Sequence, residues 1–171
     1  MDKVIHTVVT GFQAGAERGV ALSVEDYNSR IGFSAIELTG FFDKNNPPEC
    51  ESLPDWLLPR SSVRYQEKFE LSIDASDGAV IFSPDSANGV GMVQMICKQE
   101  GRPCLVFDHD ESHCPREVGQ WIAKNRIMRL SAFGMRESKM PGIQEKVFVS
   151  FLDIIGQAFI AGWANKKGEM K

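Results

Sequence analysis

The stretch that decides the fold is Val4-Ile5-His6-Thr7-Val8-Val9, followed by Thr10-Gly11-Phe12-Gln13-Ala14-Gly15-Ala16-Glu17. A run of mostly β-branched residues ends in a short loop with two glycines, and the loop leads directly into a helical pattern. This order is typical of a strand–loop–helix turn whose backbone N–H groups face an anion at the start of the helix. Glycine suits such a loop because a residue without Cβ permits tight turning and close backbone approach.

The rest of the chain repeats the order of strand, loop and helix. After the first strand, we expect further strands at residues 33–38, 79–82, 103–107 and 127–131. Residues 39–62 have no clear period and are expected to form a packed loop. Residues 65–73 fit a helix or a strand by period alone, and we choose a helix because the next strand needs a crossover connection.

Five strands alternating with helices predict an α/β domain over residues 1–165, followed by a solvated tail at residues 166–171. The expected fold is doubly wound and Rossmann-like, with a mainly parallel five-stranded sheet and helices on both faces. Such sheets bind ligands beyond the carboxyl ends of their strands, near the topological switch point. Four polar loops fall on that edge: residues 10–15, 83–91, 108–114 and 132–142.

Composition argues against several classes of partner. The formal net charge of −4 is the opposite of the basic surface that extended nucleic acid requires. We also expect no membrane partner, because no stretch looks apolar over the roughly 20 residues that span a bilayer. The four cysteines form no C-x-x-C pair and follow no signal peptide, so free thiols in a cytoplasmic protein are expected.

Two glycine-containing loops supply candidate ligand-binding residues. The first loop contains neither G-x-G-x-x-G nor a Walker A motif, so it fits a ligand loop or simply a tight turn. Glu17, the acid that follows this loop, is placed to hydrogen-bond a ligand. Alternatively, it is merely favoured in the first helical turn by the helix dipole. The candidates from these two loops are Gly11, Gln13, Gly15, Glu17, Gly89 and Gly91.

The charged loop at residues 133–142 is the more specific signal. Arg136 offers a bidentate guanidinium, Lys139 a point charge and Ser138 a hydroxyl, and the last helix is expected to begin beside them. These groups together suit phosphate or another oxyanion. The alternative is a charged loop that is merely solvated. In contrast, residues 108–114 are rich in His and carboxylates but lack the spacing of a structural zinc site, so no metal ligand is assigned.

These motifs resemble the circularly permuted YpsA-like family, which includes molybdenum-carrier-like proteins. The family lies in a larger group of Rossmann-like nucleotide-binding domains, with the lysine-decarboxylase-like and DprA-like proteins. The resemblance spans about residues 4–160 and rests on residues 8–18, 76–82 and 101–106. Its most diagnostic part is Arg136-Glu137-Ser138-Lys139-Met140-Pro141-Gly142-Ile143.

The chain departs from the family pattern at two loops. The family's first loop reads Gly-Gly-Gln-Thr-Gly with an acid two residues on, and here Phe12 and Ala14 replace the second glycine and the threonine. After the third expected strand the family tends to have Gly-Gly-Thr, where this chain has Gly89-Val90-Gly91. A bulky Phe12 is expected to restrict backbone approach by a ligand, and the lost threonine removes a hydroxyl.

The resemblance implies a molybdenum-carrier-like protein that binds a nucleotide or an oxyanion, phosphate or molybdate, at the carboxyl edge of the sheet. We expect a homo-oligomer without catalytic residues. The alternative is a nucleotide-processing enzyme of the N-glycosidase type, as in the lysine-decarboxylase-like relatives. Binding is favoured because Gly91 is not followed at the same spacing by the carboxylate of their Pro-Gly-Gly-x-Gly-Thr-x-x-Glu motif. A scaffold that has lost binding is a third possibility.

Overall fold

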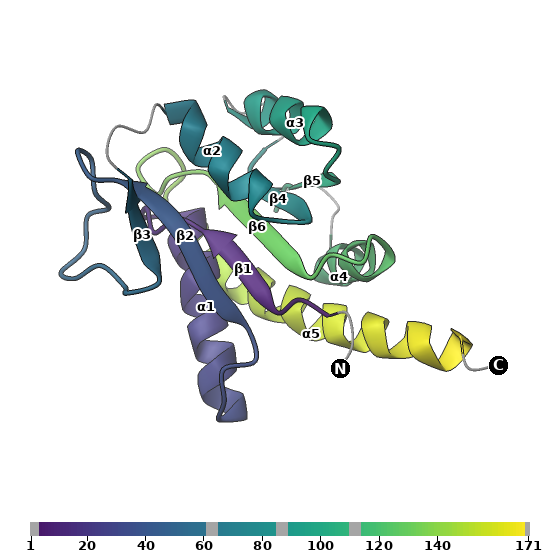
Figure 1. The fold of residues 1–171 in the computed structure, drawn as a ribbon. Helices are drawn as coiled ribbons and strands as arrows, with labels where there is room; N and C mark the ends of the chain where they lie inside the picture. The colour runs from purple at the N-terminus through teal and green to yellow at the C-terminus, as the bar shows by residue number, and fades with distance from the viewer. Residues whose placement is uncertain (1–3, 61–64, 85–88, 110–113, 170–171) are drawn as a thin grey trace.

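The computed structural model of the protein describes residues 4–60, 65–84, 89–109 and 114–169. Figure 1 shows how the strands and helices are arranged. In chain order they are β1 (Thr7–Thr10), α1 (Ala16–Ile31), β2 (Glu37–Asp43), β3 (Leu57–Arg60), α2 (Tyr65–Asp74), β4 (Gly78–Phe82), α3 (Val90–Gln99), β5 (Cys104–Phe107), α4 (Pro115–Lys124), β6 (Arg129–Gly134) and α5 (Ile143–Glu169).

The strands form one parallel sheet in the order β3-β2-β1-β6-β4-β5. The predicted doubly wound α/β fold is therefore confirmed, but the sheet has six strands and not five. The extra strand is β3, which lies within the stretch expected to be a packed loop. Because β3 is a short edge strand that contains Pro59, it carries a poor strand signal in the sequence.

The second strand begins later than expected. We predicted a strand at residues 33–38, whereas β2 runs over Glu37–Asp43. The side chain of Asn28, near the end of α1, explains the shift. Its Oδ1 accepts hydrogen bonds from the N–H groups of Ala35 and Ile36, and its Nδ2 donates to the carbonyl of Ile36. The backbone before Glu37 is thus tied to α1.

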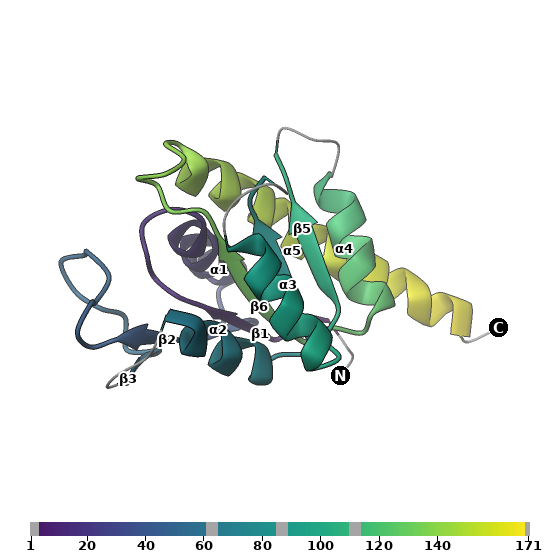
Figure 2. The ribbon, with the colours of Figure 1, turned by 90° about the horizontal axis from the view of Figure 1, so that it is seen from above.

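Helices cover both faces of the sheet, as expected. Helices α1, α4 and α5 pack on one face and α2 and α3 on the other (Figures 1 and 2). The strand β4, which lies between β6 and β5, alternates between the two cores: Val80 and Phe82 face the first layer, and Ala79 and Ile81 face the second. A strand buried on both faces explains why this stretch is continuously apolar in the sequence.

The helix chosen for residues 65–73 is confirmed as α2. Its buried residues Phe69 and Ile73 lie one helical turn apart, and both pack in the core beneath α2 and α3. The ring of Phe69 also contacts that of Phe133 on β6, edge to face. Packing between helix and sheet therefore decides a segment whose period fitted a strand equally well.

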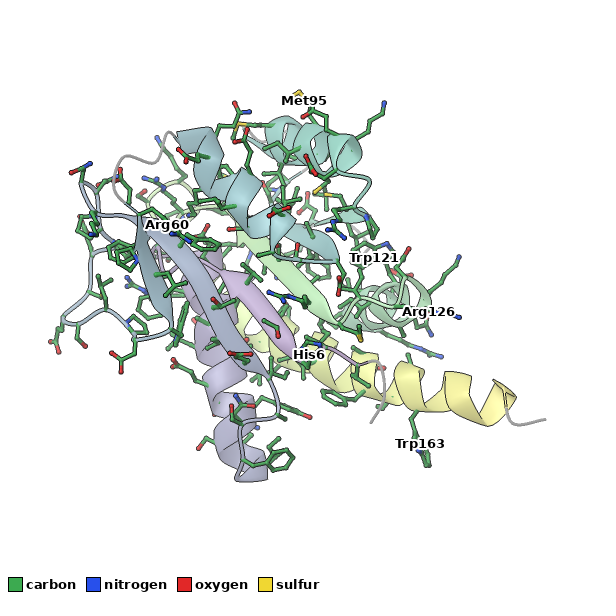
Figure 3. The ribbon with its side chains drawn as sticks, in the orientation of Figure 1. His6, Arg60, Met95, Trp121, Arg126 and Trp163 are labelled. Atoms are coloured by element: carbon green, nitrogen blue, oxygen red, sulfur yellow. The ribbon has the colours of Figure 1, made fainter. Side chains whose placement is uncertain are left out.

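The last helix, α5, extends beyond residue 165, where the domain was expected to end. It runs to Glu169, so most of the expected tail is helical. By length and composition alone, its stretch Ile143–Ala164 is long and apolar enough to cross a membrane, whereas no stretch of that length was recognised as apolar in the sequence. In this structure α5 packs along α1 and α4 and buries side chains such as Phe151 and Ile154. Near its end Trp163 points away from the core (Figure 3).

The topology fixes where loops from distant parts of the chain meet. Helix α1 connects β1 to β2 on one face of the sheet, whereas α3 connects β4 to β5 on the other face and in the opposite direction. The carboxyl edge between β1 and β4, with β6 between them, is therefore the topological switch point. The loops that follow β1, β6 and β4 begin at this edge.

Candidate functional site

Two loops cross at the switch point. Gly15, in the loop after β1, forms an antiparallel bridge with Arg136, in the loop after β6. The N–H of Ala16 donates to the carbonyl of Met135 (3.0 Å), and the N–H of Glu137 donates to the carbonyl of Ala14 (2.9 Å). Residues 121 positions apart in the chain are thus joined through their backbones.

This crossing requires glycine at position 15. Gly15 has φ +120°, a conformation that L side chains rarely adopt. A Cβ added there would lie 2.5 Å from the backbone nitrogen of Glu137 and would overlap the carbonyl oxygen of Met135. The missing Cβ permits close approach as predicted, but the group that approaches is the chain's own backbone.

The acid of the diagnostic motif, Glu137, holds the start of α5. Its carboxylate accepts hydrogen bonds from the N–H groups of Gly142 and Gln144, and these bonds lower the pKa of the Glu137 carboxyl. The side chain of Gln144 in turn accepts a hydrogen bond from the N–H of Gly15 (3.3 Å). The negative charge favoured at the N-terminus of α5 is therefore supplied by Glu137 itself.

The N–H groups at the start of α1 are likewise largely engaged. Gly15 and Ala16 donate to the loop after β6 and to Gln144, as described above, and the N–H of Arg18 donates to the carbonyl of Gln13. In the described part of the chain, no acceptor lies opposite the N–H groups of Phe12, Gln13 and Ala14. The donors open to an anion are therefore in the loop itself, one turn earlier than the sequence pattern suggested.

Glu17 lies beside this loop in a buried ion pair with Lys68 of α2. The ammonium of Lys68 contacts both carboxylate oxygens of Glu17, at 2.7 and 2.9 Å. The side chain of Glu17 is only 7% exposed and that of Lys68 20%. A Cβ at Gly11 would overlap the Glu17 carboxylate and lie 3.0 Å from Lys68 Nζ, so the pair rests directly on the backbone of Gly11.

The polar side chains predicted to bind ligand from the loop after β6 are not held by ion pairs of this kind within the described residues. Arg136, Ser138 and Lys139 are all exposed. Their side chains make no ion pair or hydrogen bond with any residue that the structure describes. The backbone bridge at Arg136 nevertheless holds their loop against Gly15. The structure therefore brings residues 136–139 together with the first glycine loop.

Phe12 turns its ring toward residues 44–56, the long connection between β2 and β3. The ring contacts Trp56 edge to face, at 5.8 Å between centroids, and the guanidinium of Arg18 lies 4.9 Å from its centroid. Arg18 also donates to the carbonyls of Phe12 and Glu49. Phe12, at the position where the family resemblance implies a glycine, thus anchors a neighbouring segment to the first loop, and this anchoring contact was not expected.

The second glycine loop is only partly described. Residues 85–88 lie outside the described residues. Gly89, with φ +97°, is the residue before α3, and Gly91 lies in the first turn of α3. Both are exposed, and a Cβ at either would meet no heavy atom within 4 Å. Their place after β4 puts them at the same edge as β6, but no backbone hydrogen bond among the described residues joins them to residues 10–15.

The loop after β5 offers no metal centre where it is described. Residues 110–113 lie outside the described residues, and in the rest of the chain no three His, Cys, Asp or Glu side chains converge. His109 is hydrogen-bonded through Nε2 to Ser150 (2.9 Å).

The four cysteines are free thiols, as predicted. The thiols of Cys97 and Cys104 share a hydrogen bond, which lowers the pKa of Cys97 and raises that of Cys104.

Lys68, Glu137 and Gln144 are the residues of this site that sequence reasoning missed. Lys68 lies 51 positions from its partner, and nothing in the helical pattern around Phe69 distinguishes it from a surface lysine. Glu137 lies in the diagnostic motif, but the sequence pattern was not interpreted as giving it a structural role. Its position five residues before Gly142 and seven before Gln144 was the available signal for a carboxylate that caps α5.

A parallel, doubly wound sheet whose loops meet at the switch point defines a Rossmann-like α/β protein. The comparisons give the family. The model of the circularly permutated YpsA SLOG family matches residues 8–155, and the chain belongs to this family. The resemblance inferred from the four sequence motifs is thereby confirmed.

A solved structure supports the fold. The chain is similar to the crystal structure, at 1.45 Å resolution, of a protein from Syntrophus aciditrophicus SB that is named "Putative molybdenum carrier protein". The TM-score is 0.70 at 22% sequence identity, over 92% of this chain and 96% of that chain. At this identity the likeness is evidence for the fold. No curated protein matches the chain.

Proposed function

We propose that the protein binds a phosphate-type oxyanion, either the phosphate of a nucleotide or molybdate, at the crossing of the loops after β1 and β6. The family and the name of the Syntrophus protein support a molybdenum-carrier-like role. The ligand-binding groups in this proposal are the backbone of residues 11–15 and the side chains of Arg136, Ser138 and Lys139. Gly89 and Gly91 would extend the site toward β4.

The observation that carries the proposal is the backbone bridge between Gly15 and Arg136. Within the described residues, it fixes a loop with two exposed cations that make no ion pair against a loop with three N–H groups that have no acceptor. Arg136 provides a fork of donors and Lys139 a mobile point charge, and both recognise tetrahedral oxyanions. Consecutive backbone N–H groups in a turn form an anion-binding concavity.

Binding is proposed over turnover because of Glu17. Hydrolysis of an N-glycosidic bond needs a carboxylate within reach of substrate that gives or takes a proton. Glu17, the acid of the first loop, is buried, and both its oxygens contact the ammonium of Lys68. Held in this way, Glu17 is a poor general base.

Calorimetric titration with molybdate, inorganic phosphate and AMP tests the proposal, with Lys139→Ala as the main variant. A charge-assisted hydrogen bond contributes roughly 1.5–3 kcal/mol, so its loss should weaken binding about tenfold to a hundredfold. Affinity should fall as salt rises, and less steeply in the variant. Lys124→Ala is the matched control, because Lys124 is exposed at the far end of α4, toward the opposite edge of the sheet. Equal affinities of Lys139→Ala and the wild type would place Lys139 outside the site.

The expected homo-oligomer and cytoplasmic location stay predictions. A titration interpreted with one site per chain needs the oligomeric state, so sedimentation velocity on the same sample should accompany it. We expect a species larger than the 171-residue monomer. A single monomeric species at the concentration used for titration would contradict that prediction and leave the binding proposal intact.

A further inference from the structure

The buried ion pair of Glu17 and Lys68 is the part of the site that the motifs do not explain. It joins α1, in one helical layer, to α2, in the other, across the carboxyl edge of the sheet. Burying two charges costs free energy that their attraction repays only in part, so such a pair is weak evidence for a stabilising role. Its position on the backbone of Gly11 points instead to the ligand loop.

We propose that Lys68 is a ligand-binding residue: its ammonium donates to the bound oxyanion at the Gly11 end of the loop, while Glu17 holds that ammonium in place. This inference rests on the proposed function and adds to it a cation from α2. The oxyanion would then meet positive charge at both ends of residues 11–15, from Lys68 at Gly11 and from Arg136 and Lys139 at Gly15.

The geometry of the ammonium supports this role. A lysine ammonium has three N–H donors, and two contacts to Glu17 leave one donor for another acceptor. The side chain of Lys68 is 20% exposed, so it is reachable from solvent, whereas Glu17 at 7% is nearly closed off. The N–H groups of Phe12, Gln13 and Ala14, which follow Gly11 directly, also lack acceptors in the described chain.

The same geometry gives Glu17 an indirect role. Its carboxylate fixes the direction of the Lys68 ammonium but would repel an anion that came close. Because Glu17 is the more buried partner, a ligand that reaches Lys68 contacts its exposed side first. Glu17 is therefore a positioning residue, and replacing its charge should act differently from replacing the charge of Lys68.

Titration of inorganic phosphate and molybdate into three variants tests the inference. Lys68→Met should weaken binding at least about tenfold, and Lys68→Arg, which keeps a cation, should stay within a few-fold of the wild type. Glu17→Gln should bind as tightly as the wild type or more tightly, because it removes the nearby negative charge. Lys98→Met, at an exposed position in the last turn of α3, controls for the change from lysine to methionine.

Each outcome decides between separate claims. If Lys68→Met binds phosphate like the wild type while Lys139→Ala is weakened, the inference is overturned and the proposed function stands. If Glu17→Gln and Lys68→Met lose affinity equally, the pair acts only by holding the loop, and the inference is again overturned. If the wild type binds none of the anions, both proposals fail. Should Lys68→Met not fold, Lys68→Arg and Glu17→Gln still decide: a direct contact by the cation predicts that both bind about as tightly as the wild type or more tightly, whereas a pair that only holds the loop predicts that Glu17→Gln loses affinity.

Discussion

The two sides of the Gly15 crossing carry charge in opposite ways. On the side of α2, Glu17 is buried, Lys68 is half-buried, and their charges neutralise each other. On the side of β6, Arg136 and Lys139 are exposed and make no ion pair within the described residues. Both sides contact the same five-residue loop, one at Gly11 and the other at Gly15.

The difference separates what the fold needs from what a ligand needs. A buried charge must be paired, because leaving its partner unpaired in the interior is costly. An exposed charge is solvated and contributes little to folding. Substitutions of Arg136 and Lys139 should therefore change binding but leave the stability of the fold nearly unchanged. Glu17 and Lys68, in contrast, form an ion pair between the two helical layers. Substitutions of Glu17 and Lys68 should change stability and, at Lys68, binding as well.

The largest effect is expected from Gly15→Ala, which breaks the crossing itself. A non-glycine residue at φ +120° is strained, and the new Cβ would collide with the backbone at Glu137. We expect a loss of at least about 3 kcal/mol in the free energy of unfolding. Chemical denaturation measures it, with Gly156→Ala as the control. Gly156 lies in α5 with open space around it, and alanine there should add about 0.5–1 kcal/mol. A Gly15→Ala protein as stable as the wild type would show that the two loops are not locked together.

A smaller loss is expected when the buried pair is broken from one side. Lys68→Met leaves the Glu17 carboxylate buried without its cation, and we expect a loss of about 2–3 kcal/mol, reduced from the fully buried case because Lys68 is partly exposed. The double variant Glu17→Met/Lys68→Met should recover most of that loss, since it removes both charges. Urea denaturation of the single and double variants measures the coupling. If the double variant is the least stable of the set, the ion pair stabilises the fold, and its attraction outweighs the cost of burying the two charges.

The order of strands and helices was predictable because it depends on local pattern. Runs such as residues 79–82 are apolar because β4 is covered on both faces, and that signal is visible in any window. The grouping of the loops after β1 and β6 at one edge followed from the parallel topology alone. The topology thus predicted that the loops containing Gly15 and Arg136 lie at the same edge, but it did not predict the backbone bridge between them.

The features that were missed depend on partners outside the element concerned. Lys68 is distinguished only by Glu17, and β3 only by its neighbour β2, which supplies the pairing that its own four residues barely signal. The start of β2 depends on the side chain of Asn28, one helix earlier. In each case the deciding interaction is a single side chain or edge contact, which leaves no periodicity in the sequence.

A still smaller effect is expected at the cap of α5. Glu137→Gln removes the charge that accepts hydrogen bonds from Gly142 and Gln144, and we expect a loss of about 1 kcal/mol at pH 7. The pKa of Glu137 is lowered in the folded protein, so its stabilisation is complete above its ordinary value of 4.5 and is lost as pH falls through the folded-state pKa. Denaturation at pH 7 and pH 3 should therefore show a smaller difference from the wild type at pH 3 than at pH 7. The same difference at both values would mean that the charge is irrelevant. Glu145→Gln, an exposed acid in the first turn of α5, is the control.

The smallest effect on stability is expected on the exposed side, and there the ligand should reveal the function. The double variant Arg136→Ala/Lys139→Ala should unfold within about 0.5 kcal/mol of the wild type when no anion is present, because neither side chain has a partner in the described chain. Phosphate at a hundred times the wild-type Kd should stabilise the wild type by about 2.7 kcal/mol. If the two substitutions together weaken binding a hundredfold, the same phosphate concentration should stabilise the variant by only about 0.4 kcal/mol. Thermal unfolding with and without phosphate measures both quantities on one sample. A variant that is destabilised without phosphate would show that these side chains hold the loop, and one that keeps the full phosphate effect would place them outside the binding site.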